Sequence, residues 1–320
     1  DPESLAAQKN WKKIVVLCAG SLINLLTPII IFFIIFLFPT ETIKENIQVI
    51  GVAPGSPAES AGIQKGDTII SIDNRQIDNQ FDLINVIYVN LGSDTKLSIR
   101  KSSTIAGISS SPDTFTTKSV SLTPRYNPPK LDVVSKVSDP KTQVAVAVAQ
   151  NYDPSIQVGD QMRQGAIGVR IASNNQRIIT HKNNPLRAIR LSLQRVLDVI
   201  IITKNGLAQW ASGGENPGLS GPVGIVQLSS EVVQQGLKPL LNLIAIISIS
   251  LAIFNLLPIP ALDGGRVAFI LLEIVRGGKK IPHEKESIIN AISFMILLAG
   301  IIIISYFDII RIFNGTDVIK

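Results

Sequence analysis

The sequence predicts a multi-pass α-helical membrane protein with an inserted extracytoplasmic α/β domain. Three observations predict this class. Three stretches of the chain are uncharged and apolar over about 20 residues or more, which is the length needed to cross a bilayer. A long polar region with short strand-like segments separates the first stretch from the second. Lys and Arg residues cluster at one end of each stretch, and this asymmetry orients the spans.

The predicted spans are residues 14–40, 240–262 and 287–307. Buried core helices are the alternative, but uncharged runs of this length favour spans. Basic residues lie before the first span and between the second and third, so we expect residues 1–13 and 263–286 in the cytoplasm. The region between the first two spans and the tail at 308–320 are then extracytoplasmic, and the inner membrane is the expected location.

The composition agrees with spans joined to a soluble domain. Of 320 residues, 46% are hydrophobic, yet 17% are charged. The net charge of +6 is explained by the basic flanks of the spans. A nucleic-acid partner is excluded because the basic residues are scattered and the chain has only four Tyr and two Trp. Cys18 is the only cysteine, so an intrachain disulfide is impossible.

The extracytoplasmic domain is predicted over residues 47–172. Its expected strands and short helices, in chain order, are 49–52 (strand), 58–61 (helix), 68–72 (strand), 81–89 (helix), 97–100, 119–122 and 166–171 (strands). Residues 102–116 are rich in Ser and Thr and predict a mobile loop. Residues 123–164 are interpreted as an insertion or long loop, in which Val144 to Val148 could form a strand.

Two further segments connect this domain to the second span. Residues 185–210 place apolar side chains on one helical face, which predicts an amphipathic helix. This helix could lie on the membrane surface or pack on the domain, and the neighbouring spans favour the membrane surface. Residues 211–236 form a loop region rich in glycine and containing a Gly-Pro pair.

The most informative motif runs from Asn255 to Gly265 and sets Asp263 at the end of the second span. Burying a carboxylate at this depth in the membrane costs free energy, so we expect Asp263 to have a function there. Pro258 and Pro260 prevent a regular helix from continuing, and Gly264 with the next glycine lets a backbone or ligand approach closely. Such irregular backbone must be shielded by protein or line a cavity. Helix capping near Val267 is the alternative role for Asp263.

These residues resemble a known family. Asn255-x-x-Pro258-x-Pro260-x-Leu-Asp263-Gly264-Gly looks like the C-terminal metal motif of site-2 proteases, which are intramembrane zinc metalloproteases. Ala-Gly-Ser21-Leu-Ile-Asn24 is similar to their Gly-Pro-x-x-Asn motif, with Ser21 in place of proline. The segment 220–225 also resembles the family, and the order of elements matches over nearly the whole chain.

The resemblance implies Zn²⁺ as cofactor, with Asp263 as one of three protein ligands. It also implies that Asn255, Pro258 and Pro260, supported by Gly264 and Asn24, line the active site and hold the substrate backbone. From the residues alone, the two asparagines could instead form hydrogen bonds between helices.

The domain at 47–172 resembles a PDZ domain through Ser56-Pro-Ala, Ala-Gly62-Ile and Gly66-Asp67. PDZ domains bind an extended peptide at a sheet edge, and the expected groove is Ile50, Gly51 and Val52. A spacer domain without a ligand is the alternative.

One part of the family's active site is missing from this sequence. The family supplies two His ligands and a general-base Glu from a His-Glu-x-x-His helix, and this chain has no such motif. Its histidines are His181, predicted at the surface in a polar turn, and His283, predicted at a solvated helix start. We therefore expect a chain truncated at its N-terminus, with no catalytic residue present and no activity alone.

The predicted function is intramembrane zinc metalloendopeptidase activity on transmembrane segments of membrane proteins, such as anti-sigma factors or signal-peptide remnants. The expected partners are these substrates, a peptide ligand of the PDZ-like domain and membrane lipid. Two alternatives belong to other classes. One is an inactive homologue that acts as a PDZ-containing membrane scaffold. The other is a transporter subunit, which the lack of repeated broken spans disfavours.

Overall fold

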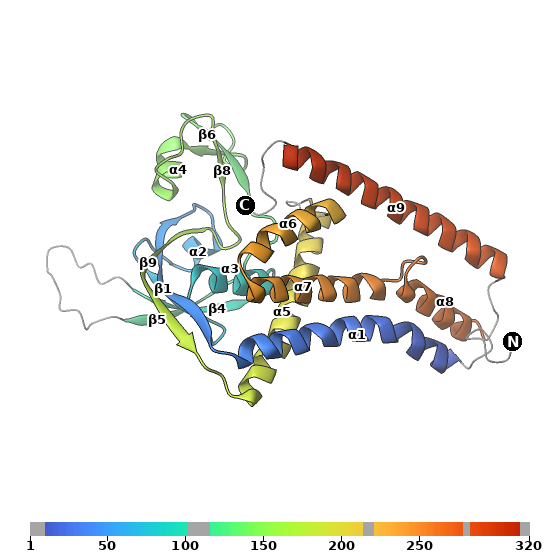
Figure 1. Ribbon diagram of the computed structural model, residues 1–320. Helices are drawn as coiled ribbons and strands as arrows, with labels where there is room; N and C mark the ends of the chain where they lie inside the picture. Colours follow the sequence, from blue (N-terminus) through green and yellow to red (C-terminus); the bar gives the residue numbers. More distant parts are fainter. Residues whose placement is uncertain (1–9, 102–115, 214–220, 278–281, 314–320) are drawn as a thin grey trace, which may run out of the picture. The chain divides into compact units, whose positions relative to one another are not determined.

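The computed structural model describes residues 10–101, 116–213, 221–277 and 282–313 (Figure 1). The loop expected at 102–116 lies outside these residues except for Thr116. Residues 1–9 of the predicted N-terminal segment and residues 314–320 of the predicted tail also lie outside them. The chain divides into two compact units. The first contains residues up to 39, 182–203 and 218 onward, and the second contains 40–181 and 204–217.

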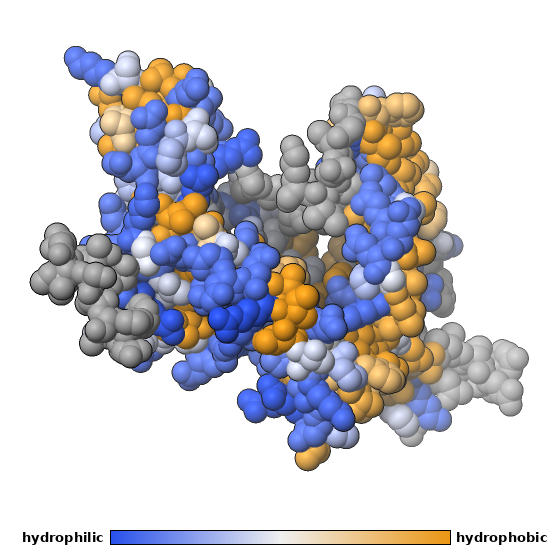
Figure 2. Space-filling model, turned by 60° about the vertical axis from the view of Figure 1, so that its left-hand side comes forward, coloured by the Kyte–Doolittle hydropathy of each residue, from blue (hydrophilic) through white to orange (hydrophobic). Residues whose placement is uncertain are grey.

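Three helices of the first unit are long and apolar enough to cross a membrane. They are α1 (Asn10–Leu37), α7 (Leu237–Leu256) and α9 (His283–Phe313), so each of the three predicted spans corresponds to a helix that could cross a membrane. The helices of this unit carry much of the hydrophobic surface in the space-filling view (Figure 2). The first span ends earlier than predicted because Pro39 follows it and the chain becomes a strand at Thr40.

The core of the first unit joins α1, α7 and α5 (Pro185–Ala211). Phe32 and Ile35 of α1 pack with Val196 and Val199 of α5, and the α7 residues in this cluster are Ala245 and Ile249. The predicted amphipathic helix is therefore α5, and at Val196 and Val199 its apolar face packs against the spans. Two shorter helices complete the unit: α6 (Pro222–Gln234) and α8 (Asp263–Val275). The prediction of a loop region at 211–236 is therefore wrong for residues 222–234, which form α6. Within the segment predicted at 263–286, residues 263–275 are helical.

The second unit contains a six-stranded antiparallel sheet with the order β5-β4-β2-β1-β9, in which β3 also pairs with β2. The strands are β1 (Thr40–Val52), β2 (Thr68–Ile72), β3 (Arg75–Gln76), β4 (Thr95–Arg100), β5 (Thr117–Leu122) and β9 (Val169–His181). The helices α2 (Pro57–Ser60) and α3 (Gln80–Val89) accompany the sheet. Its core includes Ile47, Ile69, Leu97 and Leu83.

The predicted strands and helices of this unit all exist, but β1 and β9 are much longer than predicted. They pair from Thr40 with His181 to Val52 with Val169. His181 is therefore the half-buried last residue of a strand rather than part of a polar turn. The turn between β2 and β3 has Asp73 and Asn74 at φ +46° and +64°, which suits a tight hairpin.

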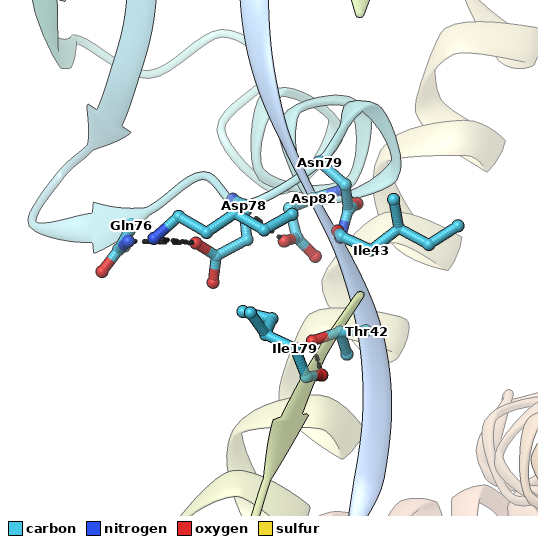
Figure 3. Close-up of polar contacts among 8 residues, drawn as sticks. Thr42, Ile43, Gln76, Asp78, Asn79, Asp82 and Ile179 are labelled. Atoms are coloured by element: carbon cyan, nitrogen blue, oxygen red, sulfur yellow. Dashed lines mark hydrogen bonds and ion pairs between the residues drawn. The ribbon is translucent and has the colours of Figure 1, made fainter. Parts of the chain in front are cut away.

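The N-terminus of α3 is tied to β1 by a group of polar contacts (Figure 3). The Asn79 side chain donates to the Ile43 carbonyl (3.4 Å), and Asp78 forms an ion pair with Lys44 (3.4 Å). The backbone N–H of Glu45 donates to the Asp78 carbonyl (2.7 Å). These contacts fix the start of α3 beside the first half of β1.

The segment interpreted as a long loop at 123–164 is instead a small folded module. It contains the sheet β7-β6-β8 and helix α4 (Val146–Tyr152) around a core of its own. The strands are β6 (Lys130–Val134), β7 (Gln143–Ala145) and β8 (Gln161–Arg163). Only the start of the strand considered at Val144 to Val148 is extended, because α4 begins at Val146.

Candidate active site

The second span ends in irregular backbone, as the prolines predicted. Helix α7 stops at Leu256, and the next residue, Leu257, is extended. Two tight backbone hydrogen bonds shape the segment that follows: Ile259 N–H to the Leu257 carbonyl (2.7 Å) and Leu262 N–H to the Ile259 carbonyl (2.8 Å). Helix α8 then begins at Asp263. We call residues 257–262 the break.

The two glycines after Asp263 allow α8 to pack directly on this break. A Cβ at Gly264 would overlap the carbonyl oxygens of Leu256 and Leu257, and a Cβ at Gly265 would overlap that of Ile259. The close approach expected from the Gly-Gly pair is therefore confirmed, and the approaching group is backbone. This contact fixes where the first turn of α8, with Asp263, lies.

Asp263 does not cap α8 with its side chain. The cap position is Leu262, and it makes no side-chain hydrogen bond to the helix. As the first helical residue, the half-buried Asp263 carboxylate lies where the helix dipole favours negative charge. It also lies beside α1, because a Cβ placed on Gly20 would be 3.8 Å from Asp263 Oδ2. The two motifs that the sequence suggested thus meet in space.

A pocket of about 200 Å³ opens where these elements meet. Four predicted site residues line it: Asn255, Pro258, Asp263 and Gly264. Pro260 and Asn24 are not among the lining residues, and Asn24 lies about one turn beyond Ser21 on α1.

The sequence interpretation missed the other walls of the pocket, which are Leu17, Cys18, Ser21, Leu256, Val267, Ala268 and Leu271. Helical spacing could have identified several of them. Residues 263, 267 and 271 follow one another by four along α8, as do residues 17 and 21 along α1, so each set shares a helix face.

The donor atoms at this pocket fit zinc only in part. Zinc takes Cys, His and carboxylate ligands, usually four in all with one position open for water in a catalytic site. Asp263 supplies one suitable carboxylate. Across the residues that the structure describes, no three His, Cys, Asp or Glu side chains gather in one place. The described residues therefore offer one carboxylate suited to zinc and do not form a complete zinc site.

Comparison with known proteins decides the family, because the model of peptidase family M50 matches residues 1–300. The chain belongs to peptidase family M50. The resemblance to site-2 proteases is thereby confirmed.

Relatives carry names that agree with this family. Zinc metalloprotease RasP of Oceanobacillus iheyensis is 28% identical, with 96% of this chain and 62% of the relative covered. RasP of Geobacillus kaustophilus is 27% identical (96% and 61%), and a putative zinc metalloprotease of Clostridium acetobutylicum is 25% identical (97% and 76%). The chain thus spans about three fifths of the length of the two RasP relatives. The names indicate zinc as the cofactor and support a protease; they do not bear out the expectation of an inactive fragment.

The second unit has a pocket of its own, of about 340 Å³. Arg125 lines it and donates through Nη2 to Gln164 Oε1 (2.7 Å). Its buried Nε has no hydrogen-bond partner among the described residues, and burial lowers the pKa of this guanidinium. The pocket also includes Tyr88 and Gly165. No sequence motif pointed to Arg125, because it was placed within the presumed loop.

The peptide groove predicted at Ile50, Gly51 and Val52 does not coincide with a free sheet edge. Gly51 and Val52 pair with β9, and Ile50 lies at an irregularity in that pairing. A Cβ placed on Gly51 would also overlap the backbone carbonyl oxygen of Tyr152. The edge strand on this side of the sheet is β9.

Proposed function

We propose that this chain forms part of an intramembrane zinc metalloendopeptidase that cleaves transmembrane segments of membrane proteins. The observation that carries the proposal is the position of Asp263. It lies at the broken end of a span, beside Gly20 of another span, on a pocket that Asn255 and Pro258 also line. Membership of family M50 supports a metalloprotease.

Each residue has a physical role in this proposal. Asp263 supplies one zinc ligand, and when bound the metal lowers the pKa of a water molecule and polarises the scissile carbonyl. A substrate helix must unwind before cleavage because its backbone is hydrogen-bonded internally. Backbone groups of the break can then pair with the unwound segment. The Asn255 amide can both donate to and accept from the substrate backbone.

The test is Asp263→Ala in the protein as its gene encodes it, reconstituted in lipid. We expect this variant to lose cleavage of a reporter transmembrane helix and to bind less zinc. Glu273→Gln is the matched control, because Glu273 is another carboxylate of α8 that does not line the pocket. Retained cleavage by Asp263→Ala would exclude the assignment. Absence of zinc from the unmodified protein would favour the inactive scaffold.

We also propose that the larger sheet, with α2 and α3, is an extracytoplasmic PDZ-like domain that binds peptide. The exposed edge of β9 offers strand addition, and Arg125 offers a cation for a terminal carboxylate. A peptide with a free C-terminus should then bind more tightly than its amidated form, and Arg125→Gln should abolish that difference. Arg75→Gln, on β3 and therefore outside both β9 and this pocket, serves as control. Equal binding of both peptides by the unmodified protein would favour a spacer.

The location and substrates complete the proposal. The basic flanks of the spans support an inner-membrane location with this domain on the extracytoplasmic side. Single-span proteins such as anti-sigma factors, or the remnants of signal peptides, present the type of helix that this site would take.

A further inference from the structure

The pocket beside Asp263 is lined mostly by apolar residues and by a few polar ones. The walls come from Leu17 of α1 and from Val267, Ala268 and Leu271 of α8. The polar residues that line the pocket include Asp263 and Asn255, to which the proposed function assigns the metal and the substrate backbone. From this arrangement we infer that the pocket is a specificity subsite that holds one apolar side chain of the substrate next to the scissile bond. The inference rests on the proposed function and adds the determinant of sequence preference.

The size of the pocket matches a single side chain. Sites for whole small-molecule ligands usually occupy about 300–1,000 Å³, and this pocket has about 200 Å³. Its walls present methyl and methylene groups, so a charged or amide side chain would lose its hydrogen bonds to water without replacement. An aliphatic or aromatic side chain would fill the space at no such cost.

Ser21 supplies a second, independent observation. It is buried at 5% exposure, lines the pocket, and its hydroxyl has no hydrogen-bond partner among the described residues. Two other hydroxyls in the spans form hydrogen bonds within their own helices. Thr27 donates to the Ile23 carbonyl (2.8 Å) and Ser250 to the Ile246 carbonyl (3.0 Å), each within its own helix. The Ser21 hydroxyl is therefore left to bond a group that enters with the substrate, and an unwound backbone offers such groups.

Ala268 has the smallest side chain among the lining residues apart from Gly264, so a larger residue there would reduce the volume of the subsite. A leucine there would occupy part of the pocket, whereas Leu271→Ala would enlarge it. One methylene in an apolar pocket changes discrimination between substrates by about 10–200-fold. The two substitutions should therefore shift preference in opposite directions.

The experiment uses the protein as its gene encodes it and reporter helices in which one residue near the cleavage site is Ala, Leu or Phe. Ala268→Leu should raise the ratio of kcat/KM for Ala over Phe by about 10–200-fold at one substrate position. Leu271→Ala should lower that ratio. Ala291→Leu is the matched control, because Ala291 is exposed on α9 and outside the pocket.

Cys18 gives a readout that does not depend on cleavage, since it is this chain's only cysteine and it lines the same pocket. Alkylation of Cys18 by a lipid-permeant maleimide should be slower in Ala268→Leu, faster in Leu271→Ala and unchanged in Ala291→Leu. If the unmodified protein cleaves no reporter, the proposed function is wrong. If the alkylation rates of Cys18 are the same in all variants, residues 18, 268 and 271 do not line one pocket. If the unmodified protein cleaves reporters but both variants keep the original order of preference, the subsite inference alone is overturned.

Discussion

At the scale of single residues, Asp308 is the side chain whose role only the structure reveals. It is 1% exposed near the end of α9, and its Oδ2 accepts hydrogen bonds from the N–H groups of Gly221 (2.8 Å) and Gly224 (2.9 Å). These are N–H groups at the start of α6, where a helix has no acceptors of its own. Asp308 therefore fastens α6 to the last span.

We predict that Asp308→Ala destabilises the first unit by about 2–4 kcal/mol, because two buried N–H groups lose a charged acceptor. Asp308→Asn keeps one acceptor oxygen and should cost less. Hydrogen exchange in micelles checks this locally, since the amides of Gly221 and Gly224 should exchange faster in Asp308→Ala. Ile303→Ala, exposed on the same helix, should leave them unchanged. Equal protection in all variants would contradict the role.

Asp153 makes a pH-dependent contribution in the second unit. Its carboxylate accepts from the Ser155 hydroxyl (2.8 Å) and N–H (3.1 Å) and pairs with Arg170 (2.9 Å). These contacts, the Ser155 hydrogen bonds foremost, lower the pKa of Asp153 below its usual 3.8. The stabilisation is therefore present above pH 3.8 and is lost as the pH falls through the lowered pKa.

Asp153→Asn tests this contribution. It should destabilise the second unit at pH 7 by less than about 1 kcal/mol, because the group is near the surface and solvent screens it. The difference from the unmodified protein should shrink as the pH falls below 3.8. Thermal unfolding measured across this pH range gives the result, and a difference that grows on acidification would contradict the sign.

At the scale of elements, the junction of α7 and α8 depends on the missing side chain at Gly265. A Cβ there would overlap the Ile259 carbonyl, and backbone in this tight segment cannot move aside as a side chain could. We predict that Gly265→Ala displaces the start of α8 and abolishes cleavage. Gly300→Ala is the matched control, because a Cβ at Gly300 in α9 meets nothing within 4 Å. Full activity of Gly265→Ala would show that the break tolerates movement.

Sequence patterns predicted those helices and strands whose characteristic residues lie within one short stretch of the chain. The spans could be predicted because an uncharged apolar stretch of about 20 residues usually forms a membrane-spanning helix. Strand β2 matches its predicted bounds, since turn residues limit it on both sides. The module around β6, β7 and β8 escaped prediction because its strands have only three to five residues, too few for periodicity. Contacts such as Asp308 with Gly221 join distant segments and leave no local pattern.

For the candidate site too, the sequence predicted the residues of one contiguous motif and not those that packing brings together. Asp263 and its Pro and Gly neighbours form one contiguous motif, so their proximity is given by the chain. Ser21, Cys18 and Ala268 have ordinary residue types for a span, and only the packing of α1 on α8 brings them to the pocket. Polarity and spacing alone therefore identify the carboxylate and the helix faces, but not which residues of α1 and α8 meet at the pocket.

At the scale of the whole molecule, the proposed orientation follows from charge around the three spans. Lys12 and Lys13 lie in the first turn of α1, and Arg276 and Lys285 lie between α8 and the apolar part of α9. Basic residues next to spans stay on the cytoplasmic side. Because the number of spans between them is even, both clusters can lie on that side together, with the sheet-bearing unit outside.

Single-cysteine labelling of intact cells tests this orientation. In a Cys18→Ala background, Val158→Cys, exposed in the module, should react with a membrane-impermeant maleimide without lysis. Lys285→Cys, exposed near the start of α9, should react only after the membrane is opened. The physical reason is that a charged reagent cannot cross the hydrocarbon core, so labelling reports the side on which a residue lies. The reverse pattern would invert the topology and place the sheet-bearing unit in the cytoplasm, where it could not meet the extracytoplasmic ends of substrates.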